Sequence, residues 1–202
     1  MTVTHLFFDI GGVLGSNAWD REQRAAAVAA FHLDAAELAE RHPEAAASLE
    51  TGRMTLGEYL RTAVFHRPRA FTPEDFTAYV KGLSTPWPAS IAFARALGAT
   101  GRWRLATLNN ESAELNVHRL KAFGLTGIFG AFFSSCWLGV AKPSPRIFEL
   151  ALAMSQAEPG ASVLIDDRPR NCDAARALGM LTVQFTDVER LRGDLAALGV
   201  VI

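Results

Sequence analysis

The feature that most constrains this chain is a short apolar run near its start that ends in an acidic residue and two glycines. Residues 6–14 read Leu-Phe-Phe-Asp-Ile-Gly-Gly-Val-Leu, with the acid at Asp9. Such a run, bounded by glycine, favours a strand covered on both faces in a parallel sheet. Ligands of such sheets bind beyond the carboxyl ends of the strands, which places Asp9 at the functional edge. The stretch alone is equally compatible with an Asp9 that only caps or turns the chain.

The length and composition favour one core that carries an inserted subdomain. The chain has 202 residues, which is long for one small domain and short for two full ones. Half of the residues are hydrophobic, the formal net charge is −1, and the arginines are scattered along the chain rather than clustered. These properties argue against a nucleic-acid-binding surface.

The cysteines and the first residues of the chain predict its compartment. Cys136 and Cys172 lack paired spacing, so neither a disulfide framework nor a zinc site is expected, and a reducing compartment is the default. The start of the chain has no basic segment followed by a hydrophobic stretch, and no apolar run approaches about 18 residues. We therefore expect a soluble cytoplasmic protein without a membrane partner.

Residues 15–85 have a different character from the rest of the chain. They are alanine-rich and charged, contain no convincing strand, and predict an all-helical insert of about four helices. The segments 55–58 (Thr-Leu-Gly-Glu) and 72–75 (Thr-Pro-Glu-Asp) are typical helix starts, with a threonine N-cap and an acid three residues later. The histidines of this insert match no metal-binding spacing, and we assign them no role.

From Pro86 onward, strand and helix patterns alternate. Strands are expected at 103–108, 131–134, 163–165 and 181–185. Among the helices between them, one is expected to carry Ala113, Val117 and Leu120 on one face, and another, opened by Ser144-Pro145, carries Ile147, Leu150, Ala151 and Met154. This alternation predicts an α/β fold with a doubly wound, Rossmann-like parallel sheet. We expect a core domain of residues 1–14 and 86–202, and a helical cap subdomain of residues 15–85.

Polar residues lie just past the ends of the first four predicted strands, and in this fold those ends converge on one crevice. These residues are Asp9, Asn109-Asn110, Lys142 and Asp166-Asp167. Facing carboxylates repel one another, so the three acids imply a cation, and oxygen ligands suit Mg²⁺. A lysine and an amide beside a free carboxylate complete what phosphoryl transfer needs, because its transition state is stabilised mainly by positioning and charge neutralisation.

With these residues in place, the chain resembles the haloacid dehalogenase (HAD) superfamily of hydrolases, in its phosphatase-like branch with a helical cap inserted after the first motif. The resemblance spans nearly the whole chain. Three segments are the most specific: residues 8–14, Lys142 to Phe148 (Lys-Pro-Ser-Pro-Arg-Ile-Phe), and Ile165 to Cys172 (Ile-Asp-Asp-Arg-Pro-Arg-Asn-Cys) leading into Ala174 to Gly179.

The resemblance implies a role for each matched position. Asp9 would be the nucleophile that forms an aspartyl-phosphate, and its carboxylate would bind Mg²⁺ together with the backbone carbonyl of Gly11. Asp166 would be the direct metal ligand of the fourth strand, with Asp167 helping through water.

The remaining matched positions would support the phosphoryl group. Lys142 would neutralise Asp9 and the phosphate, and Asn109 and Asn110 would hold the phosphoryl oxygens or the loop around them. Asn171 would brace the acidic loop. The implied activity is a Mg²⁺-dependent phosphomonoesterase that acts on a small phosphorylated metabolite.

The sequence departs from the family pattern at two positions. Most phosphatases of the superfamily carry a second aspartate two residues after the nucleophile, which acts as general acid and base, whereas this chain has Gly11 there. General acid–base catalysis is worth about 10²–10⁴-fold, so we expect the rate to depend strongly on the leaving group. Asn109 stands where the family usually has Ser or Thr, and we expect it to change the geometry of phosphate binding without abolishing it.

Two alternatives remain open. Metal-independent 2-haloacid dehalogenases of the superfamily also lack the second aspartate, although the Asp166-Asp167 pair would then have no obvious use. A phospholigand-binding module that has lost catalysis is the non-enzymatic alternative. Substrate specificity is expected in loops around Trp19, Arg53, Phe65 and Trp87, which carry no motif that identifies the substrate.

Overall fold

A computed structural model describes residues 2–202. Its centre is a five-stranded parallel sheet in the order β3-β2-β1-β4-β5. The strands are β1 (His5–Phe8), β2 (Arg104–Asn109), β3 (Ala131–Ser134), β4 (Ser162–Asp166) and β5 (Leu181–Gln184). The predicted doubly wound sheet is confirmed, and the expected strands lie within a residue of the observed ones.

Helices connect the strands and form the insert. Those of the insert are α1 (Arg21–Phe31), α2 (Ala35–Glu50), α3 (Leu56–Ala63) and α4 (Pro73–Gly82). The others are α5 (Pro88–Ala99), α6 (Ala113–Ala122), α7 (Ser135–Leu138), α8 (Pro145–Ser155), α9 (Pro169–Ala177) and α10 (Val188–Ala197), with the short 3₁₀ helices η1 (Leu125–Gly127) and η2 (Pro159–Ala161). Within residues 2–202, no helix has the length and apolar character that crossing a membrane requires.

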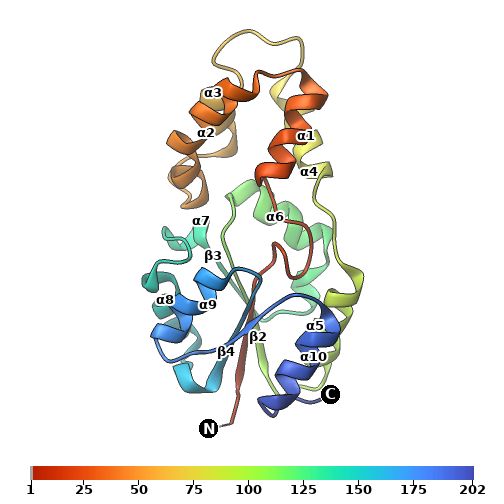
Figure 1. The fold of residues 1–202 in the computed structure, drawn as a ribbon, viewed down its shortest axis with the longest axis vertical. Coiled ribbons are helices and arrows are strands. Elements are labelled where there is room, and N and C mark those ends of the chain that lie inside the picture. Colours follow the sequence, from red (N-terminus) through yellow and green to blue (C-terminus); the bar gives the residue numbers. More distant parts are fainter. Residues whose placement is uncertain (1) are drawn as a thin grey trace.

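The two faces of the sheet bury alternate residues of each strand, as the period of two in a strand requires. In β1, Leu6 and Phe8 pack into a cluster with α5, α6 and α10, whereas Phe7 packs on the opposite side with α8 and α9. Figure 1 shows these two sets of helices on opposite sides of the sheet. All three β1 side chains are buried, so the apolar run is a strand covered on both faces.

The helices α1–α4, called the helical insert below, lie beyond the carboxyl ends of the strands (Figure 1). They surround a separate apolar cluster that includes Trp19, Tyr59 and Phe76, packed with edge-on aromatic contacts. Thr55 and Thr72 begin α3 and α4 with complete capping boxes, as predicted.

Two linkers that pair in antiparallel orientation join the insert to the sheet. The outgoing linker follows β1 and the returning linker precedes α5, and they pair through backbone hydrogen bonds. Ser16 donates its N–H to the Thr85 carbonyl at 2.8 Å, and Trp87 donates to the Leu14 carbonyl at 2.9 Å. These bonds join the two linkers between the strand ends and the insert.

The predicted faces of two helices are each wrong at one residue, whereas Leu120, Ile147 and Ala151 are buried as expected. Val117 of α6 is 56% exposed and Met154 of α8 is 63% exposed, although the helical period assigned both to buried faces. The buried face of α6 carries Asn116 and Arg119 beside Leu115 and Leu120. The two polar residues bind partners near the strand ends, and hydrophobic periodicity alone could not assign them to this face.

Candidate active site

The carboxyl ends of β1 and β4 each deliver an aspartate to one lysine. The Lys142 Nζ atom lies 3.0 Å from Asp9 Oδ2 and 2.6 Å from Asp166 Oδ2, and it also donates to the Leu108 carbonyl at 2.8 Å. All three charged side chains are buried. The lysine therefore neutralises two carboxylates that would otherwise repel each other in a medium of low polarity.

Asp166 is held by several donors at once. Its Oδ1 accepts from the Arg168 backbone N–H at 2.9 Å and from Asn171 Nδ2 at 2.9 Å, and its Oδ2 accepts from Asn171 at 3.1 Å as well as from Lys142. A carboxylate has about four acceptor positions, so these bonds fill them. The predicted bracing role of Asn171 agrees with this geometry.

Asp167 differs from its neighbour because its Oδ1 atom is buried without a hydrogen-bond partner among residues 2–202. Carboxylate oxygens of Asp9, Asp166 and Asp167 lie within 4.8 Å of one another. Gly12 makes this arrangement possible: its φ is +71°, and a Cβ atom there would collide with the Asp167 carboxylate. An unpaired oxygen within a cluster of three acids fits a hard cation such as Mg²⁺.

Burial dominates the electrostatics of this cluster. It raises the pKa of Asp9 to about 7, an effect that Lys142 opposes and Asp166 reinforces. Burial lowers the pKa of Lys142, but the charges of Asp9 and Asp166 outweigh it, so the net shift is upward and the ammonium persists. Burial and the charge of Asp166 likewise raise the pKa of Asp167. A bound cation would favour the ionised form of all three acids.

The two asparagines after β2 have different partners. Asn110 bonds both backbone groups of Lys142, accepting from its N–H at 2.8 Å and donating to its carbonyl at 2.9 Å. Asn109 faces away: its amide donates to Asn116 and its carbonyl accepts from Ser134, each at 3.0 Å. Asn110 therefore holds the lysine loop. The prediction that the Asn109 side chain binds phosphate does not fit its position, because α6 and β3 occupy its hydrogen-bonding groups.

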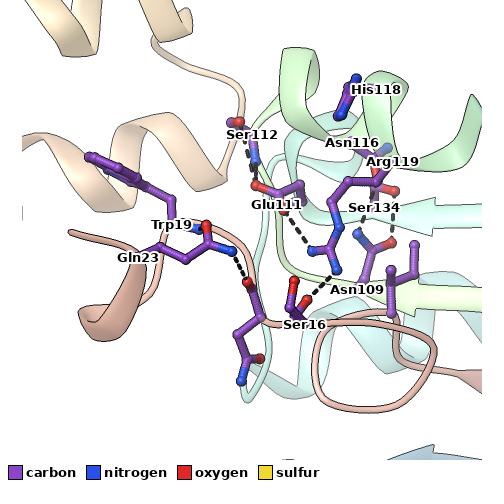
Figure 2. Close-up of polar contacts among 12 residues, drawn as sticks. Ser16, Trp19, Gln23, Asn109, Glu111, Ser112, Asn116, His118, Arg119 and Ser134 are labelled. Carbon is purple, nitrogen blue, oxygen red and sulfur yellow. Dashed lines mark hydrogen bonds and ion pairs between the residues drawn. The ribbon is translucent and has the colours of Figure 1, made fainter. Parts of the chain in front are cut away.

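A buried ion pair that the sequence analysis did not identify lies beside this loop. Arg119 of α6 reaches Glu111 at 3.2 Å and donates to the carbonyl of Ser16 in the outgoing linker, as Figure 2 shows. Both charged side chains are at least 95% buried. Gln23 of α1 extends this polar layer by donating to the Asn17 carbonyl at 2.6 Å. The layer connects α6 directly to the linker of the insert.

A pocket of about 50 Å³ opens above Asp9, between the strand ends and the insert. It is lined by Asp9, Gly11, Asn17, Ala18, Glu50, Asn110, Arg119, Lys142, Arg168 and Asn171. A second hollow of about 30 Å³ shares Ala18, Glu50 and Asn110 with it, and its remaining wall includes Trp19, His42 and Leu49 of the insert side. The two hollows together run from the strand ends into the insert.

A hydrogen-bonded chain backs the second hollow. Trp19 Nε1 donates to the Tyr59 hydroxyl at 2.8 Å, and that hydroxyl lies 2.8 Å from His42 Nδ1. The indole N–H can only donate, so the Tyr59 hydroxyl accepts from Trp19 and donates its own proton to His42. Nδ1 of His42 is then the unprotonated nitrogen, and the imidazole proton is on Nε2. Burial, together with the charge of Arg24, lowers the pKa of His42 to about 4 and keeps the ring neutral.

Glu50, His42, Glu111 and Arg119 could not be predicted from the sequence, because none belongs to a recognisable motif. The available signal was the pair of opposite charges at positions 111 and 119, since Glu111 directly precedes the N-cap of α6 and Arg119 lies on its buried face. Of the expected specificity residues, Trp19 lines the second hollow, whereas Phe65 packs against Phe71 and Phe76 and Trp87 stacks on Phe185.

Comparison with known proteins gives matches in sequence and in structure. A family model described as haloacid dehalogenase-like hydrolase matches residues 3–179. Among curated proteins, Acyl-CoA dehydrogenase family member 10 of Mus musculus is 34% identical over 70 residues, which is 35% of this chain and 6% of that protein. Flavin mononucleotide hydrolase 1 of Arabidopsis thaliana is 35% identical over 68 residues, which is 34% of this chain and 28% of that protein. The matches thus span less than a third of these relatives' own lengths.

Solved structures share the whole fold. A HAD family enzyme of Bacteroides thetaiotaomicron, crystallised with magnesium and inorganic phosphate, superimposes with a TM-score of 0.79 at 20% identity, covering 94% of this chain and 98% of that one. The L-2-haloacid dehalogenase PA0810 superimposes with a TM-score of 0.63 at 20% identity, covering 89% and 82%. At these identities the likeness concerns the fold.

Proposed function

Because the chain belongs to the haloacid dehalogenase-like hydrolase family, we propose that it is a Mg²⁺-dependent phosphomonoesterase that acts on a small phosphorylated metabolite. The observation that carries this proposal is the cluster of Asp9, Asp166 and Asp167 around one lysine, with a buried and unpartnered oxygen on Asp167. A metal-free dehalogenase would gain nothing from bringing three carboxylates together, because each added charge raises the cost of ionising Asp9.

The residues that would hold Mg²⁺ are Asp9, Asp166, Asp167 and the backbone carbonyl of Gly11. Since Asp166 is already saturated by donors, the unpartnered Oδ1 of Asp167 is the more available of the two oxygen donors on this loop. When bound, the cation would neutralise phosphoryl and carboxylate oxygens, and this would reduce the repulsion between the Asp9 carboxylate and the phosphate ester.

Each side chain of the site would then have one role in the reaction. Asp9 attacks phosphorus with its carboxylate, Lys142 stabilises the charge on the transferring oxygens, and Asn110 keeps the lysine backbone in place. We propose that residues 15–85 act as a cap that closes the pocket above Asp9. The small volume of that pocket favours a compact substrate.

Turnover of 4-nitrophenyl phosphate tests this proposal, because its good leaving group removes the need for a general acid. We expect phosphate release with Mg²⁺ and its loss in EDTA. Release of chloride from 2-chloropropionate without a metal would favour the dehalogenase alternative instead. Binding of inorganic phosphate without hydrolysis of any phosphate ester would identify a phospholigand-binding module.

A further inference from the structure

The pocket above Asp9 contains a carboxylate that the metal cluster does not use. Position 11, two residues after Asp9, is glycine, so the strand end supplies no second acid there. Among residues 2–202, the pocket is lined by two carboxylates, Asp9 and Glu50. Glu50 comes from the last turn of α2, on the opposite wall, and forms no ion pair within the described part of the chain. An acid is therefore present where the leaving group must depart, but it comes from the insert.

Glu50 lies at the junction of the two hollows. The first hollow contains Asp9 and Lys142, so it takes the phosphoryl group, and the second is walled by the insert and extends away from them. A substrate with its phosphorus at Asp9 and its remaining part in the second hollow places its bridging oxygen where the two meet. Ala18, Glu50 and Asn110 line both hollows, and of these only Glu50 can donate and accept a proton.

The backbone of Glu50 is attached to the sheet side of the molecule. Ser135 of α7 donates its hydroxyl proton to the Glu50 carbonyl at 2.5 Å and accepts from the Glu111 N–H at 3.0 Å. Two residues later, Gly52 packs so closely on α7 that a Cβ atom would collide with the Cys136 carbonyl. These contacts fix the end of α2 relative to the strand ends.

The charges around the Glu50 carboxyl act in both directions. Although the residue as a whole is exposed, desolvation of the carboxyl by the pocket raises its pKa, and Arg168, Arg170 and Arg24 oppose that shift. Glu111 and His42 face the same space from the other walls. Glu50 is also the last residue of α2, where the negative end of the helix dipole disfavours the ionised carboxylate. These surroundings leave Glu50 able to hold a proton when substrate arrives.

On the basis of the proposed phosphatase function, we infer that Glu50 is the general acid and base that replaces the carboxylate missing at Gly11. As the Asp9 oxygen bonds to phosphorus and the bond from phosphorus to the bridging oxygen breaks, Glu50 gives its proton to that oxygen, and the alcohol departs. Glu50, now a carboxylate, takes a proton from water. The water oxygen bonds to phosphorus, the Asp9–phosphorus bond breaks, and inorganic phosphate is released.

The test compares Glu50→Gln with the unmodified protein on propyl phosphate and 4-nitrophenyl phosphate. The amide keeps the size of the side chain but cannot donate an acidic proton. We expect kcat for propyl phosphate to fall by about 10²–10⁴-fold and that for 4-nitrophenyl phosphate by less than about tenfold, because nitrophenolate leaves without protonation. Glu44→Gln, an exposed glutamate on the same helix, is the matched control and should change neither rate.

A second variant excludes a merely structural effect. Gly11→Asp added to Glu50→Gln should restore much of the propyl phosphate activity, because the φ of Gly11 is not positive. A Cβ atom there would lie 2.9 Å from the Asn17 side-chain oxygen and 3.4 Å from the Asn17 Cα, so the Asn17 side chain must turn aside. Equal loss on both substrates in Glu50→Gln, or no loss, overturns the inference. So does an unmodified protein that hydrolyses the aryl ester but not the alkyl ester. Failure of the unmodified protein on both esters refutes the phosphatase proposal itself.

Discussion

The two walls of the pocket are built differently. At the strand ends, Lys142 lies between Asp9 and Asp166, and Asn171 and backbone donors occupy the remaining lone pairs of Asp166. On the insert side, the Glu50 carboxyl has no ion-pair partner among residues 2–202, and the His42 ring is neutral. The polar groups of the strand-end wall therefore hold one another in place, as binding of a phosphoryl group in the proposed function would require. On the insert wall, the Glu50 carboxyl is left free to contact the rest of a substrate.

The largest effect should come from Asp9→Asn. The amide is nearly the same size but cannot attack phosphorus, so we expect kcat for 4-nitrophenyl phosphate to fall by about 10⁴-fold or more. Circular dichroism and thermal unfolding should show that the fold persists, because Asn can still accept from the Ile10 N–H that now bonds Asp9. Full activity in this variant would remove Asp9 as the nucleophile and, with it, the distinction between the two walls.

The next largest effect is expected for Lys142→Met, which should lower the free energy of unfolding. Removing the ammonium leaves two buried carboxylates without their shared partner, which costs about 3–5 kcal/mol in the free energy of unfolding. Urea unfolding near pH 8 measures this loss. Arg146→Met is the control, because its pair with Glu149 is exposed, and it should change the free energy of unfolding by less than about 1 kcal/mol.

Arg119→Met tests the layer that joins the two walls. It breaks a buried pair with Glu111 and removes a donor to the outgoing linker, so we expect the protein to lose about 2–4 kcal/mol of stability. The double variant with Glu111→Gln should recover part of that loss, because no charge is then left buried alone. A double variant that loses the sum of both single effects would mean that the pair is not coupled.

The smallest effect concerns His42 and pH. Its folded pKa of about 4 lies below the ordinary value of 6.5, so between these values the unfolded state binds the extra proton. The contribution is fully present above pH 6.5 and is lost as pH falls toward 4. Because the ring is only half-buried, solvent screening should keep this loss to about 1 kcal/mol or less between pH 7 and pH 5. Urea unfolding at both pH values should show a smaller decrease in His42→Gln. An identical decrease in both proteins would mean that the ring is solvated.

The carboxylates of the strand-end wall could be predicted from the sequence because each lies at the end of a strand or directly after it. Asp9 and Asp166 sit at fixed offsets from apolar runs, and parallel topology brings those offsets together. The insert wall could not be predicted this way. Glu50 ends a helix whose orientation depends on Ser135, 85 residues away. A contact between residues so far apart produces no periodic pattern in the sequence. The partners of the Asn109 side chain, Asn116 and Ser134, could not be predicted for the same reason, since packing decides them.

The hydrogen bond from Ser135 to the Glu50 carbonyl also bears on product release in the proposed function. The insert contacts the core through the paired linkers, through this bond, and through the Leu56 N–H, which donates to Glu114 of α6 at 3.0 Å. If the insert opens to release the product, its bonds to α6 and α7 would break while the paired linkers bend. Opening would then limit turnover, and kcat would depend on solvent viscosity when the chemical step is fast.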